Sequence, residues 1–141
     1  MKSTGLRRIA GTALAAVAIA AGTLAAAPSA AAKANGLAID KVSFTEPNVQ
    51  VKLTYSCDPG LGQELVAQAT TLDADRTDGG TAMGVIRESK LVCDYKDHNA
   101  KVTLRPAYGT HFAKGDKVRV ALYLSADDGS VTADLTAVTV L

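Results

Sequence analysis

The residues that could do chemistry are few, and the densest group is Asp94, Asp97 and His98. A carboxylate beside a histidine can support general acid–base catalysis or bind a metal ion. However, the sequence places no serine or further cysteine as an obvious nucleophile, and it lacks the Gly-x-Ser-x-Gly pattern of hydrolases. We therefore interpret this group as a polar turn whose side chains hydrogen-bond to the backbone, with His98 packing over a disulfide as an alternative. We predict no catalytic residue and a protein that is not an enzyme.

A second acidic group, Asp73, Asp75 and Asp78, has the oxygen-rich composition of a calcium-binding loop. An EF-hand loop needs glycine at its sixth position and glutamate at its twelfth. Counted from Asp73, those positions hold Asp78 and Gly84, so the register fails. We predict a solvated hairpin tip here, and neither a metal ion nor another cofactor.

The two cysteines, Cys57 and Cys93, lie 36 positions apart. Free buried thiols or a metal pair are the alternatives to a disulfide, but neither cysteine has the paired histidine neighbours of a zinc site. In an exported chain, two cysteines favour one disulfide bond. The sequence therefore predicts a Cys57–Cys93 disulfide.

The first 32 residues have the pattern of an export signal. Lys2, Arg7 and Arg8 form a basic region, residues 9–27 are apolar and uncharged, and Ala30 to Ala32 provide a small-residue cleavage site. A permanent membrane anchor is the alternative, because the apolar run approaches spanning length. We predict a signal peptide over residues 1–32 and a secreted, extracellular domain over residues 33–141 with no membrane attachment after cleavage.

The charge balance changes once this leader is removed. The full chain carries 15 Lys and Arg against 14 Asp and Glu. The leader holds three of the basic residues and no acidic one, which leaves 12 basic against 14 acidic residues and a formal net charge of −2. Because no basic stripe remains to follow a phosphate backbone, we expect no nucleic-acid partner.

The elements that must position these residues are strands. From Val49 to Cys57 apolar and polar side chains alternate, as in a half-buried strand, and Cys57 falls on the core side. Turn residues Asp58, Pro59 and Gly60 then end it. The segment 63–72 could form a helix by its Ala and Glu content, but its threonines, its flanking glycines and the lack of a helix cap favour a strand.

Similar runs indicate about seven short strands and no convincing helix. Besides those above, the runs are 37–44, 81–88, 91–94, 101–104, 117–124 and 131–141. Their spacing predicts an all-β fold, an antiparallel β-sandwich of immunoglobulin-like type with one disulfide. The chain lacks the core tryptophan of antibody domains, and its cysteines are closer together in sequence.

A contact surface is suggested by residues at a loop and on one strand. Tyr108, His111 and Phe112 fall in an irregular segment, where an aromatic and a histidine could meet a partner. Tyr123 falls on the outward parity of its strand. Alternatively, Phe112 fills one end of the core. The last strand, 131–141, lacks lysine and proline and could pair with another chain if it is a sheet edge.

Several short motifs are spread along the chain after residue 32. They are Tyr55-Ser-Cys57-Asp-Pro-Gly, Leu91-Val-Cys93-Asp94 with His98, Val102-Thr-Leu104-Arg-Pro106, Phe112-x-x-Gly115 and Val118-Arg-Val120. In these motifs the chain resembles a family of small secreted actinobacterial domains with an immunoglobulin-like fold and no assigned function. It departs from them at Asn99-Ala100, where such domains often have an aromatic. The resemblance implies compartment and fold, and it carries over no catalytic residue.

We therefore expect a secreted, non-enzymatic β-sandwich that binds another macromolecule, such as an accessory subunit of an extracellular assembly. Its partner would be a secreted or envelope protein. A secreted protease inhibitor is the alternative, although a second disulfide to brace a reactive loop is missing. A small-molecule carrier is disfavoured by the scarcity of aromatic residues, and a hydrolase by the missing nucleophile.

Overall fold

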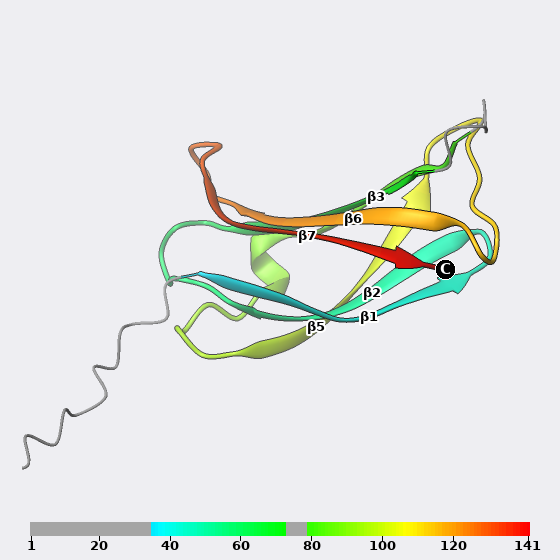
Figure 1. The fold of residues 1–141 in the computed structure, drawn as a ribbon. Coiled ribbons are helices and arrows are strands. Elements are labelled where there is room, and N and C mark those ends of the chain that lie inside the picture. The colour runs from blue at the N-terminus through cyan, green and yellow to red at the C-terminus, as the bar shows by residue number, and fades with distance from the viewer. Residues whose placement is uncertain (1–34, 73–78) are drawn as a thin grey trace, which may run out of the picture.

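The computed structural model describes residues 35–72 and 79–141, and in these residues the chain is built from seven strands (Figure 1). The strands are β1 Gly36–Thr45, β2 Asn48–Ser56, β3 Glu64–Thr71, β4 Thr81–Ile86, β5 His98–Pro106, β6 Lys117–Ser125 and β7 Val131–Val140. One 3₁₀ turn, η1 Glu88–Lys90, is the only helical element of this part of the chain. The predicted signal peptide and the acidic group Asp73, Asp75 and Asp78 lie outside the described residues.

The strands form one antiparallel sheet in the order β1-β2-β5-β4-β3-β6-β7. Its two edge strands, β1 and β7, lie next to each other, so the sheet is nearly barrel-shaped (Figure 1). The prediction of an all-β fold with about seven antiparallel strands is confirmed. The division into the two sheets of an immunoglobulin-like sandwich stays a prediction, because the pairing runs through all seven strands.

Alternation of apolar side chains explains the strands that form the centre of the core. On β2, Val49, Val51 and Leu53 are buried, and on β6 every second residue from Val118 to Leu124 is buried. The segment 63–72 is a strand, as predicted, with Leu65, Ala67 and Ala69 on the core side. Small and branched aliphatic side chains therefore fill most of the interior.

The predicted strand at 91–94 is wrong, and its hydrogen bonds give the reason. The Val92 N–H donates to the Tyr55 hydroxyl at 3.0 Å, and the Tyr95 N–H donates to the Cys57 carbonyl at 3.1 Å. Both N–H groups thus bond to the end of β2, and the segment forms an irregular loop instead of pairing with a strand.

Within residues 35–72 and 79–141, no helix has the length and apolar character needed to span a membrane.

Candidate functional site

The disulfide is present between Cys57 and Cys93, with an S–S distance of 2.02 Å and a Cα–Cα distance of 4.7 Å. Cys57 is fully buried directly after β2, as the alternation predicted. Cys93 lies in the long connection between β4 and β5. The bond therefore fixes the middle of that connection to the end of β2.

The loop after Cys93 is held by a left-handed residue and a tyrosine bridge. Tyr95 has φ 63°, in the left-handed region that is uncommon for a non-glycine residue. Its hydroxyl donates to Asp58 Oδ1 at 2.9 Å, and this hydrogen bond raises the pKa of the Tyr95 hydroxyl. After the disulfide the loop is thus tied to the turn that follows β2, and before the disulfide Val92 ties it to Tyr55 within β2.

Asp94 and His98, two of the three residues in the candidate acid–base group, form a hydrogen-bonded pair. His98 Nε2 lies 2.7 Å from Asp94 Oδ1, and the Lys96 backbone N–H donates to the same oxygen at 3.1 Å. The hydrogen bond to His98 lowers the pKa of the Asp94 carboxyl most, and the bond from the Lys96 N–H lowers it further. The His98 ring also packs at 5.8 Å from the Tyr55 ring. The hydrogen bond from the Lys96 N–H to Asp94 is of the kind expected in a polar turn. Through the His98 ring the pair contacts Tyr55, which belongs to the core.

Metal-ligating side chains do not gather in this loop. Among residues 35–72 and 79–141, no three His, Cys, Asp or Glu side chains lie close enough to hold a metal ion. Asp97 is exposed beside the pair. The disulfide and the hydrogen bonds of Val92 and Tyr95 hold the loop against the end of β2.

The four residues of the predicted contact surface do not form one patch. Tyr108 is fully exposed, at 105%, and His111 is also exposed, both in the connection from β5 to β6. Tyr123 is half-buried near the far end of β6, six residues from Lys117, which is about 20 Å along a strand. The four residues therefore do not form a single surface for a partner.

Phe112 does not belong to the predicted contact surface, because it is only 5% exposed and is part of the core. The Asp116 carboxylate accepts the Ala113 N–H at 2.7 Å and so closes the turn after Phe112. The ring lies against Gly80, where an added Cβ would come within 2.9 Å of it. The alternative prediction, that Phe112 fills one end of the core, describes its position.

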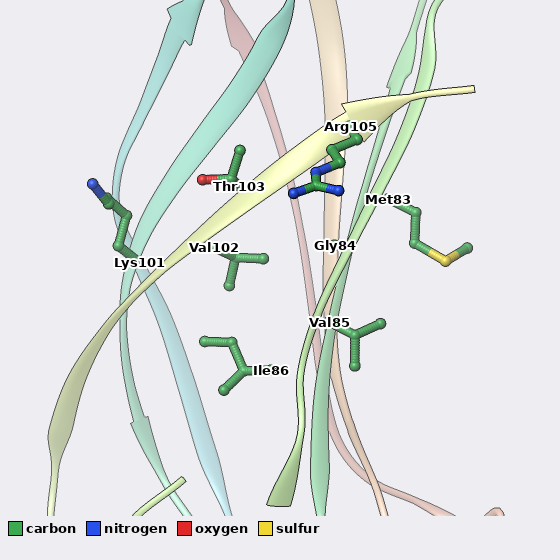
Figure 2. Close-up of a pocket in the computed structure, with 8 residues that line it drawn as sticks. All are labelled: Met83, Gly84, Val85, Ile86, Lys101, Val102, Thr103 and Arg105. Atoms are coloured by element: carbon green, nitrogen blue, oxygen red, sulfur yellow. The ribbon is translucent and has the colours of Figure 1, made fainter. Parts of the chain in front are cut away.

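A groove that the sequence did not reveal opens between β4 and β5 (Figure 2). The two strands pair only through Ala82 with Pro106 and Met83 with Arg105, and then they part. A cavity of about 480 Å³ lies at the parting. It is lined by Met83, Gly84, Val85, Ile86, Lys101, Val102, Thr103 and Arg105.

The opening continues toward the disulfide loop as a wider cavity of about 680 Å³. This second cavity shares Val85, Ile86 and Lys101 with the first. Its other lining residues are Tyr55, Arg87, Ser89, Lys90, Asn99 and Ala100. We call the two cavities together the β4–β5 groove.

The strands part because each follows a different neighbour. β4 stays paired with β3 up to Ile86, and β5 stays paired with β2 from His98 to Leu104. Strand twist then carries the two ladders away from each other. Gly84 lies at the narrow point, where a Cβ would come within 2.6 Å of the Thr103 carbonyl oxygen.

The groove combines apolar and cationic side chains. Met83 and Val85 on β4 are 51% and 47% exposed. The charged residues of its lining are Arg87, Lys90, Lys101 and Arg105, with no carboxylate among the lining residues. Among the described residues none of these four cations forms an ion pair. With apolar and cationic side chains side by side in its lining, the groove is suited to binding.

Sequence reasoning could have placed the groove's side chains but not the groove. The alternation of β4 and β5 predicts that Met83, Val85, Lys101, Thr103 and Arg105 face outward. That β4 and β5 are neighbours, and that they separate after two residue pairs, depends on contacts with β3 and β2.

Comparison with known protein families, curated proteins and solved structures finds no significant match to this chain. The resemblance to small secreted actinobacterial domains therefore stays a prediction.

Proposed function

We propose that this protein is a secreted, non-enzymatic binding domain that recognises another macromolecule through the β4–β5 groove. The groove itself carries the proposal: it exposes Met83 and Val85 among four cations that have no ion-pair partner in the described chain. An exposed apolar surface rimmed by charge is typical of an interaction site.

Secretion is supported by the signal-like pattern of residues 1–32 and by the Cys57–Cys93 disulfide, since such bonds persist in oxidising compartments. The partner we propose is a secreted or envelope protein, with this domain as an accessory subunit of an extracellular assembly. The disulfide and the hydrogen bonds of the loop around Cys93 would then hold the wide end of the groove in place.

We also assign the fold to the immunoglobulin-like sandwiches. In this assignment β1, β2 and β5 form one layer, and β4, β3, β6 and β7 form the other. The strand order supports it, since the two residue pairs between β4 and β5 are the weakest link of the sheet. In Figure 1, β1, β2 and β5 lie on one side of the molecule and β3, β6 and β7 on the other.

Site-directed photo-crosslinking tests the proposed function. A photoreactive amino acid is placed at Val85 in the groove or at Tyr108 on the exposed loop, and the protein is irradiated in the culture medium of the source cells. We expect one specific protein adduct from position 85 and none from position 108. The captured protein is then purified, and its binding to the unmodified domain is measured by calorimetry.

Two results would overturn the proposal. Adducts from position 108 alone would move the binding site to the connection between β5 and β6. A measured substrate turnover that is lost in Asp94→Asn, while the fold is kept, would make the protein an enzyme.

A further inference from the structure

We propose that the β4–β5 groove takes an extended, acidic polypeptide segment, which adds to β5 as an extra strand. This inference rests on the proposed function, and it specifies the chemistry of the partner. Its basis is the direction of the free backbone groups, the shape of the opening and the charge of its walls.

Every second peptide group of β5 points toward β4. Ala107 N–H donates to the Thr81 carbonyl at 2.7 Å, so at these two residues the peptide groups of the facing segments point toward each other. Successive residues of a strand turn their N–H and C=O groups to alternate sides. By this alternation Asn99, Lys101 and Thr103 on β5 turn their peptide groups toward the groove.

These peptide groups have no ladder partner across the groove. Pairing between β4 and β5 stops at Met83 and Arg105. Val85 on β4 has the same parity as Thr81, so it too directs its peptide group into the opening. A row of unpaired N–H and C=O groups is a template for another strand.

The opening between β4 and β5 is narrow at Gly84 and larger toward Asn99. At Gly84 the strands are still close, because a Cβ there would meet the Thr103 carbonyl oxygen at 2.6 Å. Toward Asn99 and Ala100 the groove widens to the cavity of about 680 Å³. A strand needs about 4.8 Å to its neighbour, so the wide end beside Asn99 and Lys101 is where a segment fits.

The side chains around the groove would select a particular pattern of residues in an added strand. Ile86 and Ala100 are partly buried, pack against the core and also line the opening. In Figure 2, the Arg105 guanidinium extends from β5 over the gap toward β4, whereas Lys101 turns outward. An added strand would thus meet apolar atoms on its inner face and cations on its outer face, which favours alternating apolar and acidic residues.

Other polyanions fit these observations less well. A nucleic acid or an acidic glycan could neutralise the cations, but it would not use the peptide edge of β5 or the apolar floor. The domain after residue 32 also has a formal net charge of −2, with 12 basic and 14 acidic residues, and this disfavours a general polyanion surface.

The test uses the full domain with its disulfide and a fluorescent peptide of alternating glutamate and valine. Control peptides replace glutamate with lysine, or carry N-methyl groups on alternate backbone nitrogens. Binding is measured by anisotropy, and amide hydrogen exchange is followed by mass spectrometry. We expect only the unmethylated acidic peptide to bind and to slow exchange in residues 99–103.

Charge reversal provides the matched protein variants. Arg87→Glu with Arg105→Glu places one new carboxylate on each wall, and we expect it to weaken acidic-peptide binding at least about tenfold. The control is Lys117→Glu with Arg119→Glu, which makes the same charge change on two exposed residues of β6. We expect no more than a small change in affinity from the control.

The outcomes separate this inference from the proposed function. Equal binding of the N-methylated peptide, or equal loss from both charge variants, would overturn strand addition by an acidic segment. Heparin binding without peptide binding would make the groove a polyanion site instead. If crosslinking at Val85 captures a specific protein while the peptide neither binds nor protects residues 99–103, this inference fails and the proposed function stands.

Discussion

At the scale of single residues, Phe112 and Tyr108 have opposite surroundings although both lie in the connection from β5 to β6. Phe112 packs against the core, while Tyr108 projects into solvent. The sequence showed two aromatics in an irregular segment and could not separate an anchor from a contact residue. The distinction depends on Gly80, which comes from a distant part of the chain and leaves room for the Phe112 ring.

These two residues give a matched prediction. We expect Phe112→Ala to lower the free energy of unfolding by about 3–5 kcal/mol, because it leaves a cavity in the core. Tyr108→Ala should change it by less than about 0.5 kcal/mol, because the ring is exposed. Urea unfolding of both variants checks this, and equal effects would contradict the assignment of Phe112 to the core.

The alternation from Val49 to Cys57 was enough to predict the buried side of Cys57, and two cysteines behind a signal-like segment were enough to predict their bond. The Asp94–His98 hydrogen bond was not predicted as such. Residues at a spacing of four can meet in many loop conformations, and in this one the left-handed Tyr95 lies between them.

At the scale of elements, Gly84 controls how β4 passes β5. An added Cβ would meet the Thr103 carbonyl oxygen at 2.6 Å and Val102 Cγ1 at 2.7 Å. A backbone oxygen cannot rotate out of the way, so the two strands would have to separate at the narrow end of the groove.

We therefore expect Gly84→Ala to destabilise the domain by about 1–3 kcal/mol through overpacking. The control is Gly36→Ala, where the Cβ would meet only the Ser56 hydroxyl oxygen at 2.9 Å. A side-chain hydroxyl can rotate, so the control should cost less. Thermal and urea unfolding decide between them, and a larger loss from Gly36→Ala would show that the crossing at Gly84 is not tight.

The elements were predicted best where alternation was long. β2, β3 and β6 follow from their apolar period, and the turns that separate them follow from glycine, proline and aspartate. The segment 91–94 has apolar residues but no partner strand, since the Leu91 N–H donates to the Glu88 carbonyl and the Val92 N–H to the Tyr55 hydroxyl. The groove escaped prediction for a related reason: periodicity gives the face of a residue, whereas the neighbour of a strand is set by the whole sheet.

At the scale of the whole molecule, the disulfide joins parts of the chain that the sheet alone connects weakly. The connection from Arg87 to Asp97 contains only the short η1 element and is fixed by Cys93. This connection also carries Arg87 and Lys90 at the wide end of the groove.

Replacing both cysteines with alanine should therefore lower the free energy of unfolding by roughly 4 kcal/mol, the loop-closure value for a separation of 36 residues. We also expect faster amide exchange in residues 87–97 than in β2 or β6. Urea unfolding and hydrogen exchange measure the two effects. Unchanged stability in the double variant would mean that the cross-link does not restrict the unfolded chain.

The register of the sheet also determines how the domain resists a mechanical pull on its two ends. Gly36 pairs with Ser56 at one end of the molecule, whereas Val140, next to Leu141, pairs with Lys117 at the opposite end. A pull applied between Gly36 and Leu141 is directed along β1 and β7. It loads the β1–β2 and β6–β7 ladders in shear, so that many hydrogen bonds resist together instead of opening one after another.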